Sequence, residues 1–234
     1  MSPDELEKQA VVEFFGRRPD GFFVEVGAND PHLLSQTWPL EQLGWTGLLV
    51  EPLQACADKL AAARPRSRVV RAACAGPDQR GSAVFHVADR STKSGLARHV
   101  DDQSVRYIGQ ETVPVVTLDD LLTERPPARL DFVSIDVEGT ELDVLRGFDL
   151  ARWRPELVLL EDRVSSLDKH RFFLTRGYRL LRRTGFNGWY VPRPHSARPP
   201  RGEGWRTLKK YYLGLPFRRL KLAWQARRRQ RATG

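Results

Sequence analysis

The 234-residue sequence has little cysteine and no long apolar run. Its two cysteines, Cys56 and Cys74, have neither metal-ligand spacing nor the number needed for the disulfide framework of a small secreted fold. No run approaches the ~18 apolar residues of a membrane span, and the acidic opening MSPDELEKQAVVEFF does not resemble a signal peptide. These absences favour a reduced, cytoplasmic setting, with any membrane contact peripheral.

The net charge of +9 is concentrated in one part of the chain. From Arg193 onward there are 13 Lys or Arg residues against the single acid Glu203, whereas residues 1–192 hold 25 basic and 28 acidic residues. The stretch VPRPHSARPPRGEG has the Pro, Gly and Arg content of a linker. The sequence therefore predicts one domain over residues 1–192 and a basic linker and tail over residues 193–234.

Short apolar runs alternate with helical patterns along the predicted domain. The predicted strands span residues 21–26, 47–51, 68–73, 130–136 and 155–162. The predicted helices between them span residues 33–44, 53–64 and 139–149. Nearly continuous apolar strands separated by helices predict a doubly wound α/β fold, with a mostly parallel sheet covered on both faces. A final pair of runs, at residues 177–183 and 188–193, predicts an antiparallel hairpin at the sheet edge.

Ligands of such sheets bind at the carboxyl ends of the strands, where this sequence has acids. Glu25 and Gly27 lie at the end of the first strand, and Glu51 ends the second. Glycine allows a ligand close to the backbone, Glu51 can accept both hydroxyls of a ribose, and Glu25 can meet a cationic group. The glycines of a dinucleotide fingerprint are missing after Gly27. Together these features favour S-adenosylmethionine (SAM), although each acid alone is also typical of a helix cap or a solvated strand end.

Five segments carry a family resemblance. They are FVEVGAND, GLLVEP, VPVVTLDDLL, LDFVSIDVEGTELDVLRGFDL and PELVLLED. In this order they resemble the FkbM family of methyltransferases, over about residues 20–192. The resemblance implies a class I, SAM-dependent O-methyltransferase acting on hydroxyls of sugars or polyketide-like natural products. It also implies that Glu25, Gly27 and Asn29 are cofactor-loop positions and that Glu51 is the ribose acid. Pro31 departs from the pattern, because many members have a second glycine there.

Carboxylates at two neighbouring strand ends point to the chemistry. Asp136 and Glu138 follow the fourth predicted strand, and Glu161 and Asp162 end the fifth. An alcohol needs a base or a Lewis acid to become a good nucleophile, and carboxylate oxygens suit a divalent cation such as Mg²⁺. We therefore expect Asp136, Glu161 and Asp162 as metal ligands and Glu138 as the base. Spacing alone leaves the ligand geometry open.

Two further acids, Glu141 and Asp143, fall in the first turn of the helix that follows. Acids there complement the helix dipole by ~0.3–1 kcal/mol. We therefore expect Glu141 to complement the helix dipole and Asp143 to face solvent, and neither to be a member of the site.

The segment between Phe85 and Thr112 has no clear period, which is typical of a substrate loop or of a flexible surface loop. The family resemblance implies a small Ser-rich element here, matched by Ser91, Ser94 and Gly95. We expect these three residues to belong to a substrate loop.

The tail contains a basic amphipathic pattern from Pro216 onward, with Phe217, Leu220 and Trp224 at helical spacing. Such a helix binds an anionic membrane surface, binds nucleic acid, or docks onto the body. No nucleic-acid fold signature accompanies it and the body is acidic, so we expect no nucleic-acid partner and favour the inner face of a membrane.

The sequence as a whole predicts a SAM-dependent O-methyltransferase whose acceptor is a hydroxyl of a saccharide or glycoconjugate. The alternative is a non-catalytic binding module that keeps the fold and is held at a membrane or partner by its tail. Acids such as Asp136 and Glu51 at the carboxyl ends of the strands favour the enzyme. A protein with only a structural role has no need of such acids, because an unpaired buried charge is costly.

Overall fold

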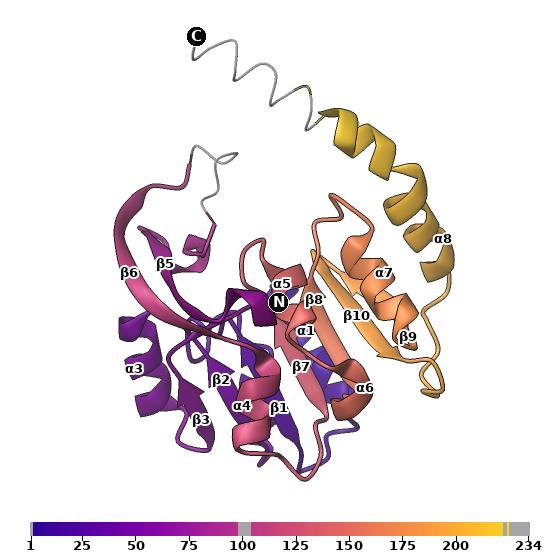
Figure 1. Ribbon diagram of the computed structural model, residues 1–234. Helices are drawn as coiled ribbons and strands as arrows, with labels where there is room; N and C mark the ends of the chain where they lie inside the picture. The colour runs from indigo at the N-terminus through magenta and orange to yellow at the C-terminus, as the bar shows by residue number, and fades with distance from the viewer. Residues whose placement is uncertain (1, 98–103, 222–223, 225–234) are drawn as a thin grey trace.

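A computed structural model describes residues 2–97, 104–221 and 224. Its centre is a seven-stranded sheet in the order β3-β2-β1-β7-β8-β10-β9 (Figure 1). The strands are β1 Phe22–Val26, β2 Thr46–Val50, β3 Ser67–Val70, β7 Phe132–Ile135, β8 Leu157–Glu161, β9 Tyr178–Thr184 and β10 Asn187–Pro192. The five neighbouring strands β3, β2, β1, β7 and β8 pair in parallel. Strand β10 runs antiparallel to both β8 and β9. The predicted α/β fold with a closing hairpin is confirmed.

Helices cover both faces of this sheet because each strand buries side chains on both sides. The helices of one face are α1 Pro3–Phe14, α2 Trp38–Gln42 and α3 Gln54–Ala63. Those of the other are α4 Leu118–Glu124, α5 Glu141–Arg146, α6 Leu150–Trp153 and α7 Asp168–Thr175. Neighbouring residues of β1 show the alternation: Phe23 packs in one core with Val11 of α1, and Val24 packs in the other with Leu121 of α4.

The register of the parallel strands aligns their carboxyl ends. Val26 lies opposite both Val50 and Ile135, and Ile135 lies opposite Leu160. The residues that follow these four are therefore brought into one row along the sheet edge. They are Gly27, Glu51, Asp136 and Glu161.

The helices differ from the sequence-based prediction at several places, and α4, α7 and α8 Glu203–Thr207 lie where no helix is predicted. Helix α1 was not predicted, although Ser2 and Glu5 form a capping box around Pro3 at its start. The helix predicted over residues 33–44 is reduced to α2, because the side chains of Ser35 and Thr37 bond to Glu25 of β1 from a non-helical loop.

A second, three-stranded sheet has the order β4-β6-β5 and was not predicted. It comprises β4 Ala73–Cys74, β5 Gly81–Ala88 and β6 Tyr107–Val116. The expectation of an irregular segment over residues 85–112 was therefore wrong where β5 and β6 pair. Much of both strands is exposed, and only residues such as Phe85 and Val113 enter a small core, so the apolar pattern that marks a buried strand is weak.

Strand β10 ends at Pro192, and the chain beyond it packs on the body. Helix α8 and a π-helix over Leu208–Leu213 begin beside α7, and helical residues 215–221 extend beyond it (Figure 1). Tyr211 is fully buried, and its hydroxyl donates to Asp162 at 3.0 Å. The rest of the predicted tail, residues 222–223 and 225–234, lies outside the described part of the chain. Among the described residues, no helix is both long and apolar enough to span a membrane.

Replacing Tyr211 with Phe should lower the free energy of unfolding by ~1–3 kcal/mol, because a buried oxygen of Asp162 loses its donor. Burial and the charge of Asp162 raise the pKa of Tyr211 to about 12, so its phenol keeps its proton and can donate. Urea denaturation measures the change. The control is Tyr212→Phe, since Tyr212 is 46% exposed and should change stability little. Equal effects of the two variants would show that residue 211 is not an anchor.

Candidate active site

A cavity of about 770 Å³ opens at the carboxyl ends of β1, β2, β7 and β8. A 3₁₀ helix, Ser91–Lys93, contributes to its wall. The volume lies within the roughly 300–1,000 Å³ of small-molecule and cofactor sites. The strand register explains the position, since it brings the row of strand-end residues to the cavity wall.

The loop after β1 forms one part of this wall. Gly27 has a φ of 82°, and a Cβ atom at this position would overlap the backbone oxygen of Asp136. Only glycine allows the ends of β1 and β7 to approach this closely. Asn29, with a φ of 47°, donates its backbone N–H to Glu51 and accepts a hydrogen bond from the Ser91 hydroxyl. The loop thus connects the strand ends to the 3₁₀ helix.

Glu51 is buried on the cavity wall with acceptor capacity to spare. Each carboxylate oxygen accepts one backbone N–H, from Leu53 and Asn29, both at 2.9 Å. A carboxylate has about four acceptor positions, so each oxygen can accept one more donor. Burial raises the pKa of Glu51 to about 7. Beyond Glu51 the cavity wall is apolar, with Phe85 and Leu96. A ribose with a flat base attached, as in SAM, fits this combination of residues.

Glu25 also lines the cavity, but its oxygens are held by the protein itself. They accept hydrogen bonds from the hydroxyls of Ser35 and Thr37 and from the backbone N–H of Gln36. Burial raises the pKa of Glu25, while these bonds and the nearby Arg64 oppose the rise. In this structure Glu25 therefore fastens the loop before α2, and a direct contact with a cofactor stays a prediction.

Four carboxylates gather on the other side of the cavity. They belong to Asp136, Glu138, Glu141 and Glu161. Oxygens of Asp136, Glu141 and Glu161 all lie within 4.8 Å of one another. Glu138 and Gly139 both have positive φ angles, 55° and 111°, so the chain turns sharply after β7. This turn brings the start of α5 back over the strand ends.

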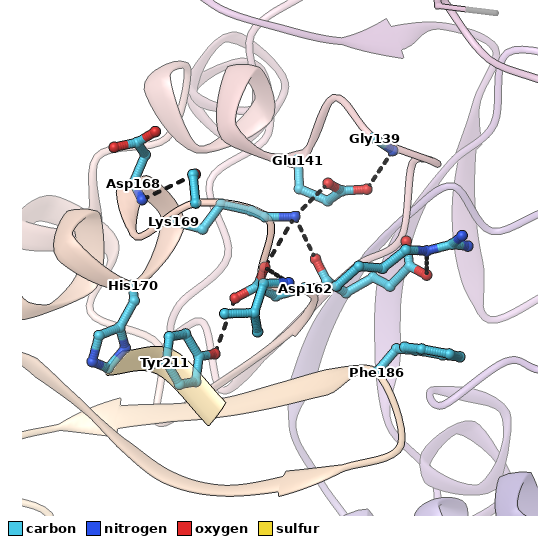
Figure 2. A network of polar contacts seen from close by, with 12 residues as sticks. Gly139, Glu141, Asp162, Asp168, Lys169, His170, Phe186 and Tyr211 are labelled. Atoms are coloured by element: carbon cyan, nitrogen blue, oxygen red, sulfur yellow. Dashed lines mark hydrogen bonds and ion pairs between the residues drawn. The ribbon is translucent and has the colours of Figure 1, made fainter. Parts of the chain in front are cut away.

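Asp162 does not belong to this group, which corrects the predicted metal ligands. Asp162 follows the last residue of β8, and unlike Glu161 it does not line the cavity. Figure 2 shows the Asp162 carboxylate beside Tyr211, with the Lys169 amine between Asp162 and Glu141. Glu141 takes the place predicted for Asp162. Glu141 is expected from the sequence only to complement the helix dipole, but it is 1% exposed, pairs with Lys169 and lies close to Asp136 and Glu161.

Basic side chains balance most of the carboxylates. Lys169 donates to Glu141 at 2.9 Å, and Arg163 donates to Glu161 at 3.1 Å. Glu138 is paired with Lys93 of the 3₁₀ helix at 2.5 Å and with Arg163 at 3.4 Å. These cations come from the 3₁₀ helix, from the residues after β8 and from α7.

Asp136 differs from its neighbours. Its carboxylate has no hydrogen bond or ion pair with the described residues, and Asp136 is exposed at the cavity wall, whereas Glu141 and Glu161 are buried. Desolvation, followed by repulsion from Glu161, Glu138 and Glu141, raises the pKa of Asp136 well above its ordinary value. Asp136 can therefore bind or release a proton near neutral pH.

A divalent cation fits this cluster poorly. Of the three carboxylates whose oxygens lie close together, Glu141 is bonded to Lys169 and Glu161 to Arg163. A metal would have to compete with both cations for the same oxygens, and it would be repelled by their charges. We therefore derive no chemical step through a metal.

The predicted substrate loop lies beside the cavity, with its residues in different roles. Ser91 bonds to Asn29, and the Ser94 hydroxyl accepts the backbone N–H of Ala88 at 2.9 Å. Gly95 forms a bridge with His86 and is not part of the cavity wall. Ser91 and Ser94 do line the cavity.

Several residues of the site were missed by the sequence analysis. The basic ones are Lys93, Arg163 and Lys169, and the apolar ones at the cavity wall are Leu33, Leu34 and Phe186. Arg163 follows the predicted strand-end acids directly, so its position was a usable signal. No sequence signal places Lys169 or Phe186 at the site, because Lys169 reaches it from α7 and Phe186 from the β9–β10 turn.

The strand order, the antiparallel β10 and the cavity at the carboxyl ends of the parallel strands define a class I methyltransferase, the SAM-dependent class. The sequence matches the methyltransferase FkbM domain over residues 25–181, more than half of the chain, and the protein therefore belongs to this family. The resemblance described from the sequence is thereby confirmed. Curated proteins give no match.

Solved methyltransferase structures are similar at low sequence identity. The METTL16 methyltransferase domain has 12% identity and a TM-score of 0.47, over 80% of this chain and 66% of that chain. The N-terminal domain of human METTL16 in complex with SAH has 13% identity and a TM-score of 0.44, over 80% and 68%. M. capricolum TrmK in complex with S-adenosyl-homocysteine has 8% identity and a TM-score of 0.41, over 79% and 65%. The chain thus spans about two thirds of the length of these structures.

Replacing Glu51 with Gln should weaken SAM binding by an order of magnitude or more, because charge-assisted hydrogen bonds of ~1.5–3 kcal/mol are lost. Hydroxyl donors favour the ionised carboxylate, so wild-type affinity should fall as the pH drops below about 7. Calorimetric titration at several pH values measures both effects. The control is Glu124→Gln, an exposed acid paired with Arg68. Unchanged affinity in a folded Glu51→Gln protein would remove Glu51 from the cofactor site.

Calorimetric titration of the wild-type protein with Mg²⁺ should show no saturable binding at the carboxylates, because Lys169 and Arg163 already neutralise two of them. Lys169→Gln removes one of these cations and should create measurable Mg²⁺ affinity. Tight Mg²⁺ binding by the wild type that Asp136→Asn abolishes would contradict the poor fit.

Proposed function

We propose that the chain is a SAM-dependent O-methyltransferase whose acceptor is a hydroxyl of a saccharide or glycoconjugate. The observation that carries this proposal is the unpaired Asp136 carboxylate, which faces the same cavity as Glu51. Its raised pKa makes it a base suited to neutral pH, and an alcohol is an acceptor that needs a base.

The cofactor would be held by residues that follow β1 and β2, together with two apolar residues of the cavity wall. Glu51 would accept the ribose hydroxyls, Gly27 and Asn29 would form the loop beside them, and Phe85 and Leu96 would contact the base. When bound, SAM supplies an electrophilic methyl group on a sulfonium sulfur, which becomes a neutral thioether on transfer. The protein's own chemical task is then to orient the acceptor and take its proton.

Asp136 would take the acceptor proton as the new oxygen–carbon bond forms. The sequence analysis gave this role to Glu138. The ion pairs of Glu138 with Lys93 and Arg163 favour a different role for it, since they fasten the 3₁₀ helix to the cavity wall. Glu138 is then a positioning residue, and its loss should affect acceptor binding more than proton transfer.

A sugar acceptor suits the mixed character of the cavity wall. Carboxylates accept hydrogen bonds from several hydroxyls, and the exposed Phe186 offers a flat apolar surface next to Arg163. The apolar face of a sugar ring can pack on such an aromatic side chain while its hydroxyls reach the acids. Leu33 and Leu34, also exposed, extend the apolar part of the wall.

The decisive experiment incubates the protein with SAM and a panel of methyl glycosides and oligosaccharides, and detects methyl gain by mass spectrometry. Asp136→Asn should lower turnover by ~10²- to 10⁴-fold while calorimetry shows SAM binding preserved. Wild-type turnover should rise with pH through the neutral range, since the raised pKa of Asp136 means that more of the base form appears.

The matched control is Asp143→Asn, because Asp143 pairs with Arg146 on α5 outside the cavity wall. Full activity of Asp136→Asn would refute the base. SAM binding without methyl transfer to any acceptor would favour the alternative, a non-catalytic binding module.

A further inference from the structure

Large apolar side chains are exposed along one short segment of the chain. Among the described residues, thirteen large hydrophobic side chains are exposed, and seven of them fall between residues 205 and 224. These seven are Trp205, Leu208, Tyr212, Leu213, Phe217, Leu220 and Trp224. Isolated exposed apolar residues are ordinary, whereas a concentration of this kind marks an interaction surface. We call this set of seven the apolar face.

The other side of the same segment is fastened to the body. Glu203 accepts the backbone N–H of Arg183, Tyr211 is buried against Asp162, and Leu215 is buried. Arg218 donates to the backbone oxygen of Val164 at 3.0 Å. These contacts account for the buried positions of the segment. The seven side chains of the apolar face are exposed on the same segment.

Basic residues are interleaved with the apolar face. Arg206, Lys209, Arg219 and Lys221 are all exposed on the same segment, and Glu203, the one acid after residue 193, is buried. A helical segment with exposed aromatic and aliphatic residues beside Lys and Arg suits the boundary between lipid headgroups and acyl chains. We infer that this face binds the surface of an anionic lipid bilayer, by inserting apolar side chains while the basic ones contact headgroups.

Two other occupants suit the face less well. Nucleic acid would satisfy the basic residues, but exposed aliphatic side chains such as Leu208, Leu213 and Leu220 gain nothing from phosphates. A second copy of the chain would bring two basic faces together, and like charges oppose such a contact. A bilayer with anionic headgroups satisfies both kinds of side chain at once.

The anchoring contacts place this face in a fixed relation to the cavity. Tyr211 bonds to Asp162, the residue that follows Glu161 of the cavity wall, and Lys169 bonds to both Glu141 and the backbone oxygen of Glu161 (Figure 2). In Figure 1 the segment rises beside α7, at the side of the sheet that carries β9 and β10. Binding to a membrane would therefore orient the whole domain on its surface.

Vesicle sedimentation tests the inference without reference to methyl transfer. The full chain should sediment with vesicles of phosphatidylcholine and phosphatidylglycerol and stay in solution with phosphatidylcholine alone. High salt should remove part of the binding, since screening weakens the charge contacts and leaves apolar insertion in place. Failure to sediment with anionic vesicles at low salt would overturn the inference.

Two variants separate the contributions. Replacing Trp205, Phe217 and Leu220 with Ser should remove the salt-resistant part and lower vesicle affinity at least tenfold. Replacing Lys209, Arg219 and Lys221 with Gln should remove the salt-sensitive part. All six side chains are exposed, so the fold should persist, as thermal denaturation can check.

The matched control replaces Val84 and Ile108 with Ser. Both are exposed apolar residues of the β5–β6 pair, away from the apolar face, and vesicle binding should be unchanged. An equal loss in this control would show that the effect is not specific to the face. The protein could instead bind a labelled RNA oligonucleotide and fail to sediment with anionic vesicles. That result would assign the apolar face to nucleic acid.

Discussion

The register of four parallel strands is the constraint on which the rest of this protein depends. Because Val26, Val50, Ile135 and Leu160 lie in line, the next residue of each strand reaches the same edge. Gly27 makes this alignment sterically tolerable, since a side chain there would collide with the Asp136 backbone. A slip of one residue in any strand would turn its site residue toward a core.

Placing several carboxylates at one edge creates an electrostatic problem that distant parts of the chain relieve. Lys93 comes from the 3₁₀ helix and Lys169 from α7, and each pairs with one acid of the group. Asp136 is left without such a partner, so desolvation and repulsion keep its proton affinity high. The same folding thus separates carboxylates that are paired with basic side chains from Asp136, which opens on the cavity without such a pair among the described residues. Tyr211 extends this network, through Asp162, to the segment after β10.

The sheet was predictable because buried parallel strands are apolar on both faces, and such runs stand out against their flanks. The positions of Gly27 and Glu51 were predictable because each residue directly follows a strand that is visible in the sequence. The β5–β6 pair was missed because its strands are largely exposed. Asp162 is predicted to act with Glu161 because the two residues are adjacent in the sequence. In the structure, Glu161 lines the cavity and Asp162 bonds to Tyr211. The place of Glu141 in the group of carboxylates cannot be predicted from the sequence, since nothing nearby in the sequence indicates Lys169.

The sequence by itself determined the class of fold, the family and the row of strand-end residues, because these follow from local patterns of apolar residues, turns and acids. Only the tertiary structure decided which acids are paired, which side chains close the cavity and where the segment after Pro192 packs. These outcomes depend on contacts between residues far apart in the chain, such as Glu141 with Lys169 and Asp162 with Tyr211. Local pattern carries no information about such partners, and in a desolvated site the partner decides whether a carboxylate is structural or reactive.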